Sequence, residues 1–326
     1  MPSPRVAELP LLRRFPGLAA LPHADFGSFP SPVETLALTG GATLAVKRDD
    51  LSGRVIGGNK VRGLEWVLGD LRAGDQVVTV GPRGSTHALA TALCARAMGA
   101  ETTVVRWNQM MNVAARRVDE RLYRAARIID AIWVPPAYAV ATTLRARGAR
   151  WIGAGGATPV ALLGHANAAL ELVEQAARRE CALPARVFVP FGTGSTAAGL
   201  ALGFRIAGVS TRVVGVRVAP RIASRYKHAL ALARRAAALI ERVTGARVPR
   251  VGPMDLTIDH AFYGGKYGRP LAKPSEHERS LSLTGMRLDD TYSRKAFAAA
   301  AAAAAHATSH DERLMFWMTF DSRLLT

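Results

Sequence analysis

The alternation of apolar and polar residues along the chain predicts strands and helices that follow one another in turn. Apolar runs bounded by turn residues predict strands at 43–50, 76–81, 101–107, 127–134, 149–156, 185–192 and 211–218. Apolar positions at helical spacing predict helices at 63–74, 86–99, 113–127, 164–180, 196–206 and 221–245. Because the strands are apolar throughout and helices separate them, we expect mostly parallel, twisted sheets covered by helices on both faces, in two α/β lobes.

The remaining segments indicate a protein that stays in a reducing compartment. Residues 1–40 are rich in proline, and their start lacks the uninterrupted apolar core of a signal peptide. No apolar run approaches the roughly 20 residues that span a bilayer. The two cysteines, Cys94 and Cys181, are expected to be free thiols. We therefore expect a cytoplasmic protein with no membrane partner.

The formal charge of +18, from 43 basic and 25 acidic residues, is strongly positive but evenly spread. The sequence has no long basic run, zinc-finger spacing or aromatic RNA-binding motif, so we expect no nucleic-acid partner. Six of the basic residues are lysines and the rest are arginines. Since lysine can lose its proton and form a Schiff base whereas arginine cannot, a lysine placed among glycines becomes a catalytic candidate. Lys60, in "IGGNKVRGLEW", is such a residue.

The clearest candidate anion site is "VFVPFGTGSTAAG" at 187–199, which is a strand, a glycine-rich loop and a helix. Glycine lets the backbone approach an anion closely, and the free amides of a helix N-terminus bind phosphate. The loop also matches the dinucleotide pattern G-x-G-x-x-A, although no acidic residue follows about 20 residues on. Arg212 or Arg217 could instead bind a 2′-phosphate, so an NADP-dependent oxidoreductase stays open. A tight turn without a ligand also stays open.

Two further loops precede predicted helices. "TVGPRGSTHALA" at 79–90 suits a carboxylate, with Ser85 and His87 as proton carriers; a plain helix cap is the alternative. In the loop at 56–60, Asn59 is expected to cap the helix and Lys60 to lie in its first turn. There the helix dipole would lower the pKa of the amine, unless Lys60 is merely an exposed lysine after a glycine turn. The mixed His and acidic runs at 257–260 and 309–312 lack metal-ligand spacing, and we expect no metal.

One lysine, one phosphate loop and one carboxylate loop form the set that pyridoxal phosphate requires. With these motifs the chain resembles the fold-type II pyridoxal-phosphate enzymes (tryptophan synthase β-like) from about residue 10 to 320. Within them it resembles the 1-aminocyclopropane-1-carboxylate deaminase and D-cysteine desulfhydrase family. We expect a large cofactor-binding domain from 1–62 and 163–326 and a small domain from 63–162. The resemblance also implies a homodimer.

The resemblance implies a role for individual residues. Lys60, in "KRDDLSG…GGNKVRGLE", would carry the cofactor, and Ser85, in "GSTH", would approach the substrate and its carboxylate. Tyr267, in "GGKYG", would face the substrate, with Thr86 and His87 as further substrate contacts. Thr319, in "LMFWMTFDS", would lie near the pyridine nitrogen. The other cofactor contacts would be Asn59, Thr86, Gly192, Thr193, Gly194, Ser195 and Thr196. "LDDTYSRKAFA" at 288–298 resembles a segment that packs the C-terminal helix.

Two departures from the family pattern bear on the reaction. Thr86 stands where the family has an asparagine that contacts the phenolic oxygen of the cofactor. Met318, Phe320 and Asp321 replace histidine and two glycines, which predicts a bulkier and more acidic pocket.

The resemblance predicts a deaminase or β-eliminating lyase that converts a small amino acid into an α-keto acid and ammonia. A D-cysteine-like or 1-aminocyclopropane-1-carboxylate-like substrate is expected. A β-replacement synthase, a racemase and a non-catalytic relative are the alternatives.

Overall fold

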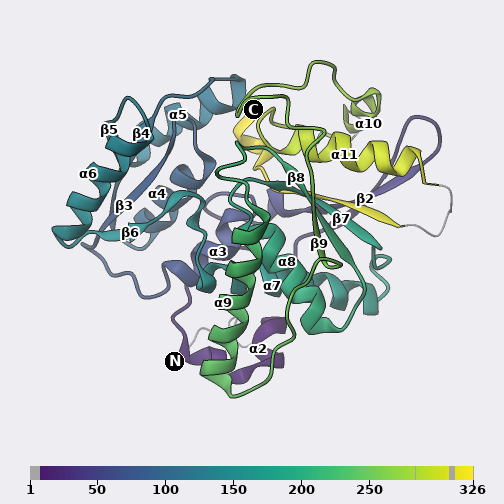
Figure 1. The fold of residues 1–326 in the computed structure, drawn as a ribbon, viewed down its shortest axis with the longest axis horizontal. Helices are drawn as coiled ribbons and strands as arrows, with labels where there is room; N and C mark the ends of the chain where they lie inside the picture. Colours follow the sequence, from purple (N-terminus) through teal and green to yellow (C-terminus); the bar gives the residue numbers. More distant parts are fainter. Residues whose placement is uncertain (1–7, 283, 308–312, 326) are drawn as a thin grey trace.

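The computed structural model describes residues 8–282, 284–307 and 313–325, which form two sheets side by side with helices packed on both (Figure 1). The larger sheet contains β1 (Val33–Ala37), β2 (Thr43–Arg48), β7 (Arg186–Phe191), β8 (Arg212–Arg217), β9 (Leu256–Asp259) and β10 (Leu314–Met318). The smaller sheet contains β3 (Gln76–Pro82), β4 (Glu101–Trp107), β5 (Arg127–Asp130) and β6 (Arg150–Ile152). The predicted α/β class with mostly parallel sheets is confirmed.

The larger sheet has the strand order β1-β2-β10-β7-β8-β9. Only β1 runs antiparallel to its neighbour; the other pairs are parallel. The strand nearest the C-terminus, β10, therefore lies in the middle of the sheet, between β2 and β7. This central position places residues 319–325 directly beside the end of β2 and the loop that leads to Lys60.

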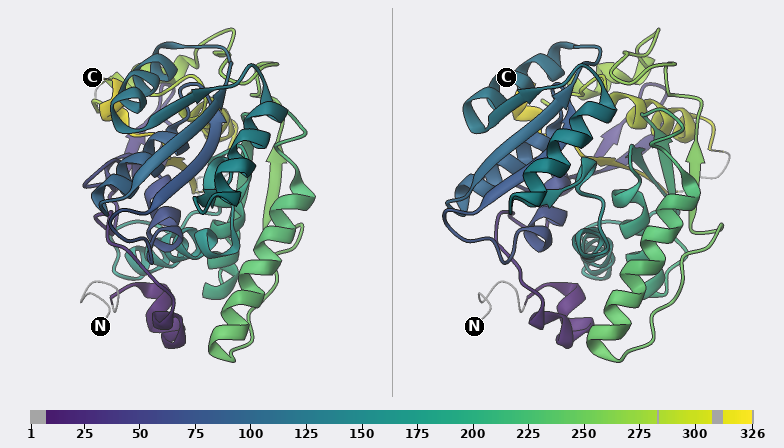
Figure 2. Two further views of the ribbon diagram at one scale, coloured as in Figure 1. Left: turned by 90° about the vertical axis from the view of Figure 1, so that its left-hand side faces the viewer. Right: turned by 60° about the vertical axis from the view of Figure 1, so that its left-hand side comes forward.

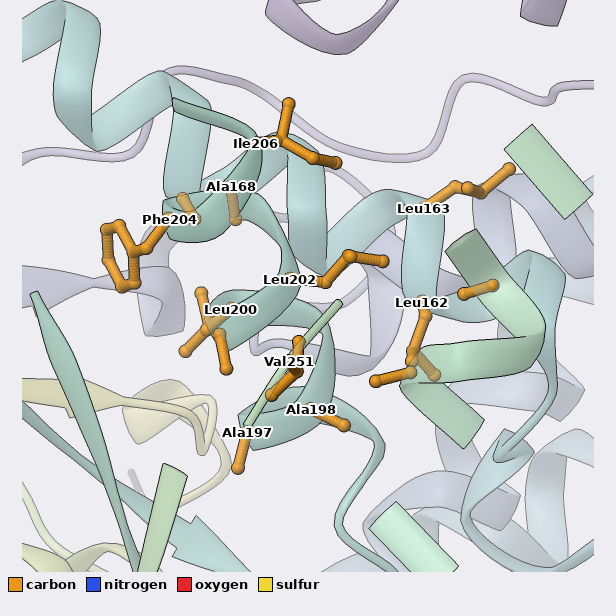
Figure 3. Close-up of a cluster of buried hydrophobic side chains, with 14 of the residues drawn as sticks. Leu162, Leu163, Ala168, Ala197, Ala198, Leu200, Leu202, Phe204, Ile206 and Val251 are labelled. Atoms are coloured by element: carbon orange, nitrogen blue, oxygen red, sulfur yellow. The ribbon is translucent and has the colours of Figure 1, made fainter. Parts of the chain in front are cut away.

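Alternate residues of the central strands enter two separate cores. Met315 and Trp317 of β10 face α7 (Pro159–Ala177), α8 (Ser195–Ala207) and α9 (Tyr226–Thr244), whereas Phe316 faces α11 (Ser293–Ala305). Figure 3 shows part of the first core, where leucines of α7 and α8 interdigitate with Val251. The alanine run of α11 is largely buried, as expected for a closely packed helix.

The smaller sheet, with strand order β5-β4-β3-β6, is parallel throughout and covered on both faces. Helices α3 (Lys60–Val67), α4 (Thr86–Ala97) and α5 (Val113–Ala125) pack on one face, and α6 (Val134–Ala146) packs on the other. Its strands all fall within 63–162 and those of the larger sheet fall outside it. The division of the chain into two domains at those bounds stays a prediction.

Several elements differ from the sequence-based expectation. The helix at 63–74 is shorter and starts earlier, at Lys60, and the strand at 127–134 stops at Asp130. The sequence did not predict the helix α6, the strands β1, β9 and β10, or the short helices α2 (Pro10–Arg14) and α10 (Arg279–Ser282).

Figure 2 shows α9 along the outside of the molecule, with its C-terminal end beside the N-terminal helices.

Two expectations from composition can be compared with the described residues. Both cysteines are free thiols, as predicted, and Cys94 is buried inside α4. None of the described helices combines the length and the apolar character needed to cross a membrane.

A buried cluster of charges ties the start of α3 to both β2 and α7. The Arg62 guanidinium donates to both Asp49 oxygens, at 2.7 and 2.9 Å, and to Glu171 at 2.9 Å. Lys47 Nζ donates to Glu171 at 2.7 Å, and Trp317 Nε1 donates to Asp49 at 2.7 Å. Burial alone would lower the pKa of Arg62, but the two carboxylates raise it. The guanidinium therefore stays charged and fixes α3 against the larger sheet.

We predict that Arg62→Met lowers the free energy of unfolding by about 3–5 kcal/mol, because it leaves two buried carboxylates without their guanidinium partner. Urea unfolding measures the change. Arg150→Met is the matched control, since Arg150 pairs with Asp70 at a solvent-exposed position and its loss should cost at most about 1 kcal/mol. Equal effects of the two substitutions would contradict the prediction.

Candidate functional site

The N-termini of three helices, α3, α4 and α8, converge on one pocket between the two sheets. Its wall consists of Asn59, Lys60, Thr86, Pro190, Gly192, Thr193, Gly194, Ser195, Thr196, Tyr292, Thr319 and Phe320. Ligands of open α/β sheets bind at such carboxyl ends of parallel strands. Each helix adds unpaired amides and the positive end of its dipole, so the pocket suits an anionic ligand.

The loop between β7 and α8 has the backbone of an anion cradle. Gly194 adopts φ +87°, and a Cβ there would lie 2.7 Å from Cζ of Phe191, so only glycine fits. Ser224 Oγ donates to the carbonyl oxygen of Gly192 at 2.9 Å. With that carbonyl occupied, the free amides at the start of α8 are the groups the loop offers to an anion.

The loop that carries Lys60 is joined to this cradle by a side chain. Asn59 has helical backbone angles and does not cap α3, so the expected cap is wrong. Its Nδ2 instead donates to Thr196 Oγ1 at 2.6 Å. Its backbone N–H donates to the carbonyl oxygen of Thr319 at 3.2 Å. The lysine loop, the α8 loop and the end of β10 are therefore held together.

Lys60 lies in the first turn of α3, as predicted, and its amine loses its proton more readily than that of an exposed lysine. Burial lowers the pKa of Lys60 to about 8. The sequence suggested the helix dipole as the cause, whereas the cause in the structure is desolvation. The neighbouring imidazoles of His87 and His165 stay neutral. Burial is the main cause and the charge of Lys60 the second; together they lower the pKa of His87 to about 3 and that of His165 well below its usual value.

The loop before α4 places only Thr86 on the pocket wall. Ser85 Oγ accepts from the Ala88 amide at 3.2 Å and caps α4, which is the alternative that the sequence left open. His87 is buried with Nε2 3.3 Å from Thr79 Oγ1. The structure thus does not bring Ser85 or His87 to the wall, and their contact with a substrate stays a prediction. The unpaired amides of Thr86 and His87 fit a carboxylate.

Tyr292, rather than Tyr267, is the tyrosine on the wall. The hydroxyl groups of Tyr267 and Tyr292 are hydrogen-bonded, with ring centroids 5.9 Å apart. Burial raises the pKa of Tyr292 to about 12, so its hydroxyl keeps its proton. Sequence reasoning missed Tyr292 because its segment was interpreted only as helix packing. The residues around the two tyrosines carry no signal that separates Tyr292 from Tyr267 as the tyrosine of the pocket.

The C-terminal substitutions do not make the pocket more acidic. The Asp321 carboxylate accepts from the Gly57 amide at 2.7 Å and pairs with Arg323 at 2.8 Å. Met318 is buried in the core under α11, away from the wall. Of the three substituted residues, only Phe320 lines the pocket. The expected acidity is therefore wrong, and the expected bulk comes from Phe320 alone.

The comparisons with known proteins agree with this arrangement. The family model described as pyridoxal-phosphate dependent enzyme matches residues 26–319, and the chain belongs to that family. A Pyrococcus furiosus protein provisionally named 1-aminocyclopropane-1-carboxylate deaminase is 30% identical over 300 residues, 88% of this chain and 86% of its own. The nocardicin C-9′ epimerase of Nocardia uniformis is 35% identical over 86% of this chain and 88% of its own.

A third relative and a solved structure point the same way. The D-cysteine desulfhydrase of Salmonella typhimurium is 28% identical over 86% of this chain and 88% of its own. The solved structure of an ACC deaminase homologue is 27% identical and superposes with a TM-score of 0.78 over 97% of this chain and 98% of its own. The chain is thus a pyridoxal-phosphate dependent enzyme. This leaves no basis for the dinucleotide alternative at 192–197.

The residues of the pocket fit the cofactor. The glycine cradle of α8 and the hydroxyls of Thr193, Ser195 and Thr196 would hold its phosphate, and Lys60 would hold its aldehyde carbon. Thr319 adds a neutral hydroxyl on the wall. In the described part of the chain no group of three His, Cys, Asp or Glu side chains could hold a metal ion, and the run at 309–312 lies outside it.

We predict that chemical acylation of Lys60 in the cofactor-free protein rises with pH around a midpoint of about 8, because only the neutral amine reacts. Peptide mass spectrometry of the segment around residue 60 measures the labelled fraction. The variant Lys60→Ala identifies the signal. A midpoint near about 10.4, the value of an unperturbed lysine, would refute the expectation.

Proposed function

We propose that the enzyme removes ammonia from a small amino acid, of the D-cysteine or 1-aminocyclopropane-1-carboxylate type, and releases an α-keto acid. The observation that carries this proposal is the arrangement around Lys60. An amine with a pKa of about 8 lies among three helix N-termini, with a protonated tyrosine on the same wall. Phe320 and Tyr292 narrow the pocket, which favours a compact substrate.

The substrate carboxylate would be held at the N-terminus of α4. The amides of Thr86 and His87 lack helical partners, and the dipole of this 12-residue helix favours a negative charge there. The Thr86 hydroxyl is hydrogen-bonded to Tyr292, so a carboxylate held at this helix start would lie beside the tyrosine. The strongly positive chain would also favour the approach of the anionic cofactor.

Two side chains would move protons. Lys60, neutral at pH values above about 8, can take the proton from the α-carbon of a D-cysteine-type substrate. The α-carbon of 1-aminocyclopropane-1-carboxylate carries no hydrogen, so with that substrate the proton would come from a ring methylene. Tyr292 keeps its proton up to a pH of about 12 and can donate it to the leaving atom, while the Tyr267 hydroxyl holds its orientation. When bound, pyridoxal phosphate supplies the electron sink for the bond that breaks.

An epimerase is the second candidate. The 35% identity to nocardicin C-9′ epimerase favours it, because epimerisation needs the same removal of the α-proton. If a different group then returned a proton to the opposite face of the α-carbon, the configuration of that carbon would be inverted. Tyr292 is the candidate donor. The two reactions therefore differ in whether a leaving group is expelled before the proton returns.

The proposal predicts two results with the purified enzyme and pyridoxal phosphate. Borohydride reduction followed by peptide mass spectrometry should place a pyridoxyl group on Lys60, and Lys60→Ala should lack it. D-Cysteine or 1-aminocyclopropane-1-carboxylate should yield keto acid and ammonia in equal amounts.

Turnover in deuterium oxide separates the two candidates. Deuterium at the α-carbon of D-cysteine, with inverted configuration and no keto acid, would replace the proposal by an epimerase. Neither product from either amino acid, in unreduced protein that has bound pyridoxal phosphate, would overturn the proposed substrate class.

A further inference from the structure

Asn112 lies between β4 and α5, outside the pocket wall, and uses its whole side-chain amide in hydrogen bonds. Its Oδ1 accepts from the Ala115 amide at 2.9 Å and so caps α5. Its Nδ2 donates to the carbonyl oxygen of Gly268 at 3.0 Å and to Thr291 Oγ1 at 2.9 Å. The residue is only 8% exposed, so water replaces none of these partners easily.

The two acceptors of Nδ2 flank the tyrosine pair of the pocket. Gly268 directly follows Tyr267, and Thr291 directly precedes Tyr292. One amide group therefore holds the backbone carbonyl of Gly268 and the side chain of Thr291, which lie on the two sides of the hydrogen bond that joins the two hydroxyls. Because only Tyr292 lines the pocket, any shift of either backbone segment changes where its hydroxyl stands.

The backbone around Asn112 is shaped for this contact. Gly268 adopts φ +76°, and a Cβ there would lie 2.8 Å from the carbonyl oxygen of Met110, so the two loops approach more closely than a side chain allows. On the other side, Asp289 accepts from the amides of Thr291 and Tyr292, at 2.9 and 2.8 Å, and fixes that turn. The donor from Asn112 thus meets two rigid acceptors.

We propose that Asn112 is a positioning residue, which reaches from the smaller sheet to set the place of the Tyr292 hydroxyl in a pocket built largely on the larger sheet. The Tyr292 hydroxyl then keeps its position only while the loop before α5 stays in contact with the segments of Gly268 and Thr291. The role of Tyr292 in proton transfer rests on the proposed function; the docking contact itself does not.

Two substitutions remove the Nδ2 donor of Asn112 while keeping an acceptor that can cap α5. Asn112→Ser and Asn112→Asp both keep a good N-cap acceptor for α5, but serine is too short to reach across and aspartate has no donor. Thr158→Ala is the matched control, because it removes a cap of the same kind from α7, where Thr158 Oγ1 accepts from Ala161 at 3.2 Å. All variants are prepared with pyridoxal phosphate bound.

The first measurement is backbone hydrogen exchange in peptides that cover 263–268 and 289–293. Loss of two buried hydrogen bonds should speed exchange in both segments by roughly tenfold in Asn112→Ser and Asn112→Asp, and not in Thr158→Ala. The amount of pyridoxyl group fixed on Lys60 should match the unsubstituted enzyme, since the lysine and the α8 loop are untouched. Exchange within twofold of the unsubstituted enzyme in both variants would overturn the proposal, as would equal effects of Thr158→Ala.

The second measurement is turnover of D-cysteine and 1-aminocyclopropane-1-carboxylate. With a mispositioned Tyr292, kcat should fall roughly tenfold while KM changes by less than about threefold, because the carboxylate site at α4 is intact. An unchanged kcat with faster exchange would overturn the positioning role. If the unsubstituted enzyme turns over neither amino acid, the proposed function fails, whereas the exchange measurement still decides whether Asn112 holds the tyrosine segments.

Discussion

The guanidinium of Arg62, held between two buried carboxylates, is the interaction on which the position of the reactive lysine depends. The helix α3 has only eight residues, which is too short to be stable by itself. Asp49, Glu171 and Trp317 bring three other segments to the same cluster. Since a buried charge without its partners is costly, this set of contacts allows one placement of the helix. Lys60, two residues before the arginine, is placed with it.

Most of the architecture could be predicted because strands buried on both faces leave long apolar runs in the sequence. The failures have local causes. Helix α6 begins with two prolines, Pro135 and Pro136, which suit a first turn but look like a loop. The strand β10 has only five residues, and its segment was interpreted for its resemblance to a family motif rather than as a strand. Its central place depends on pairing with β2, about 270 residues earlier, and only the folded chain shows that pairing.

The site divides in the same way. Lys60, Thr86 and the glycine loop at 192–196 were predictable, because glycine and hydroxyl residues at helix starts have a direct physical meaning. Tyr292 was not, since nothing in its neighbours shows which of two tyrosines faces the pocket. The charge of Asp321 was misjudged for a related reason. In the structure the Gly57 amide donates to this carboxylate and Arg323 forms an ion pair with it. The sequence shows the acidic residue but not these two partners.

The hydrogen bond from Asn59 to Thr196 joins the two segments that would hold the cofactor, the lysine loop and the α8 loop, and fixes the distance between them. The phosphate loop and the lysine belong to segments about 130 residues apart in the chain, yet this single contact makes them one receptor. With its phosphate held by the α8 loop, the cofactor would present its aldehyde to the Lys60 amine at a high effective concentration, as a bivalent ligand does at its second site. Retention of the cofactor therefore depends on the stiffness of the link between its two attachment points as well as on the strength of each.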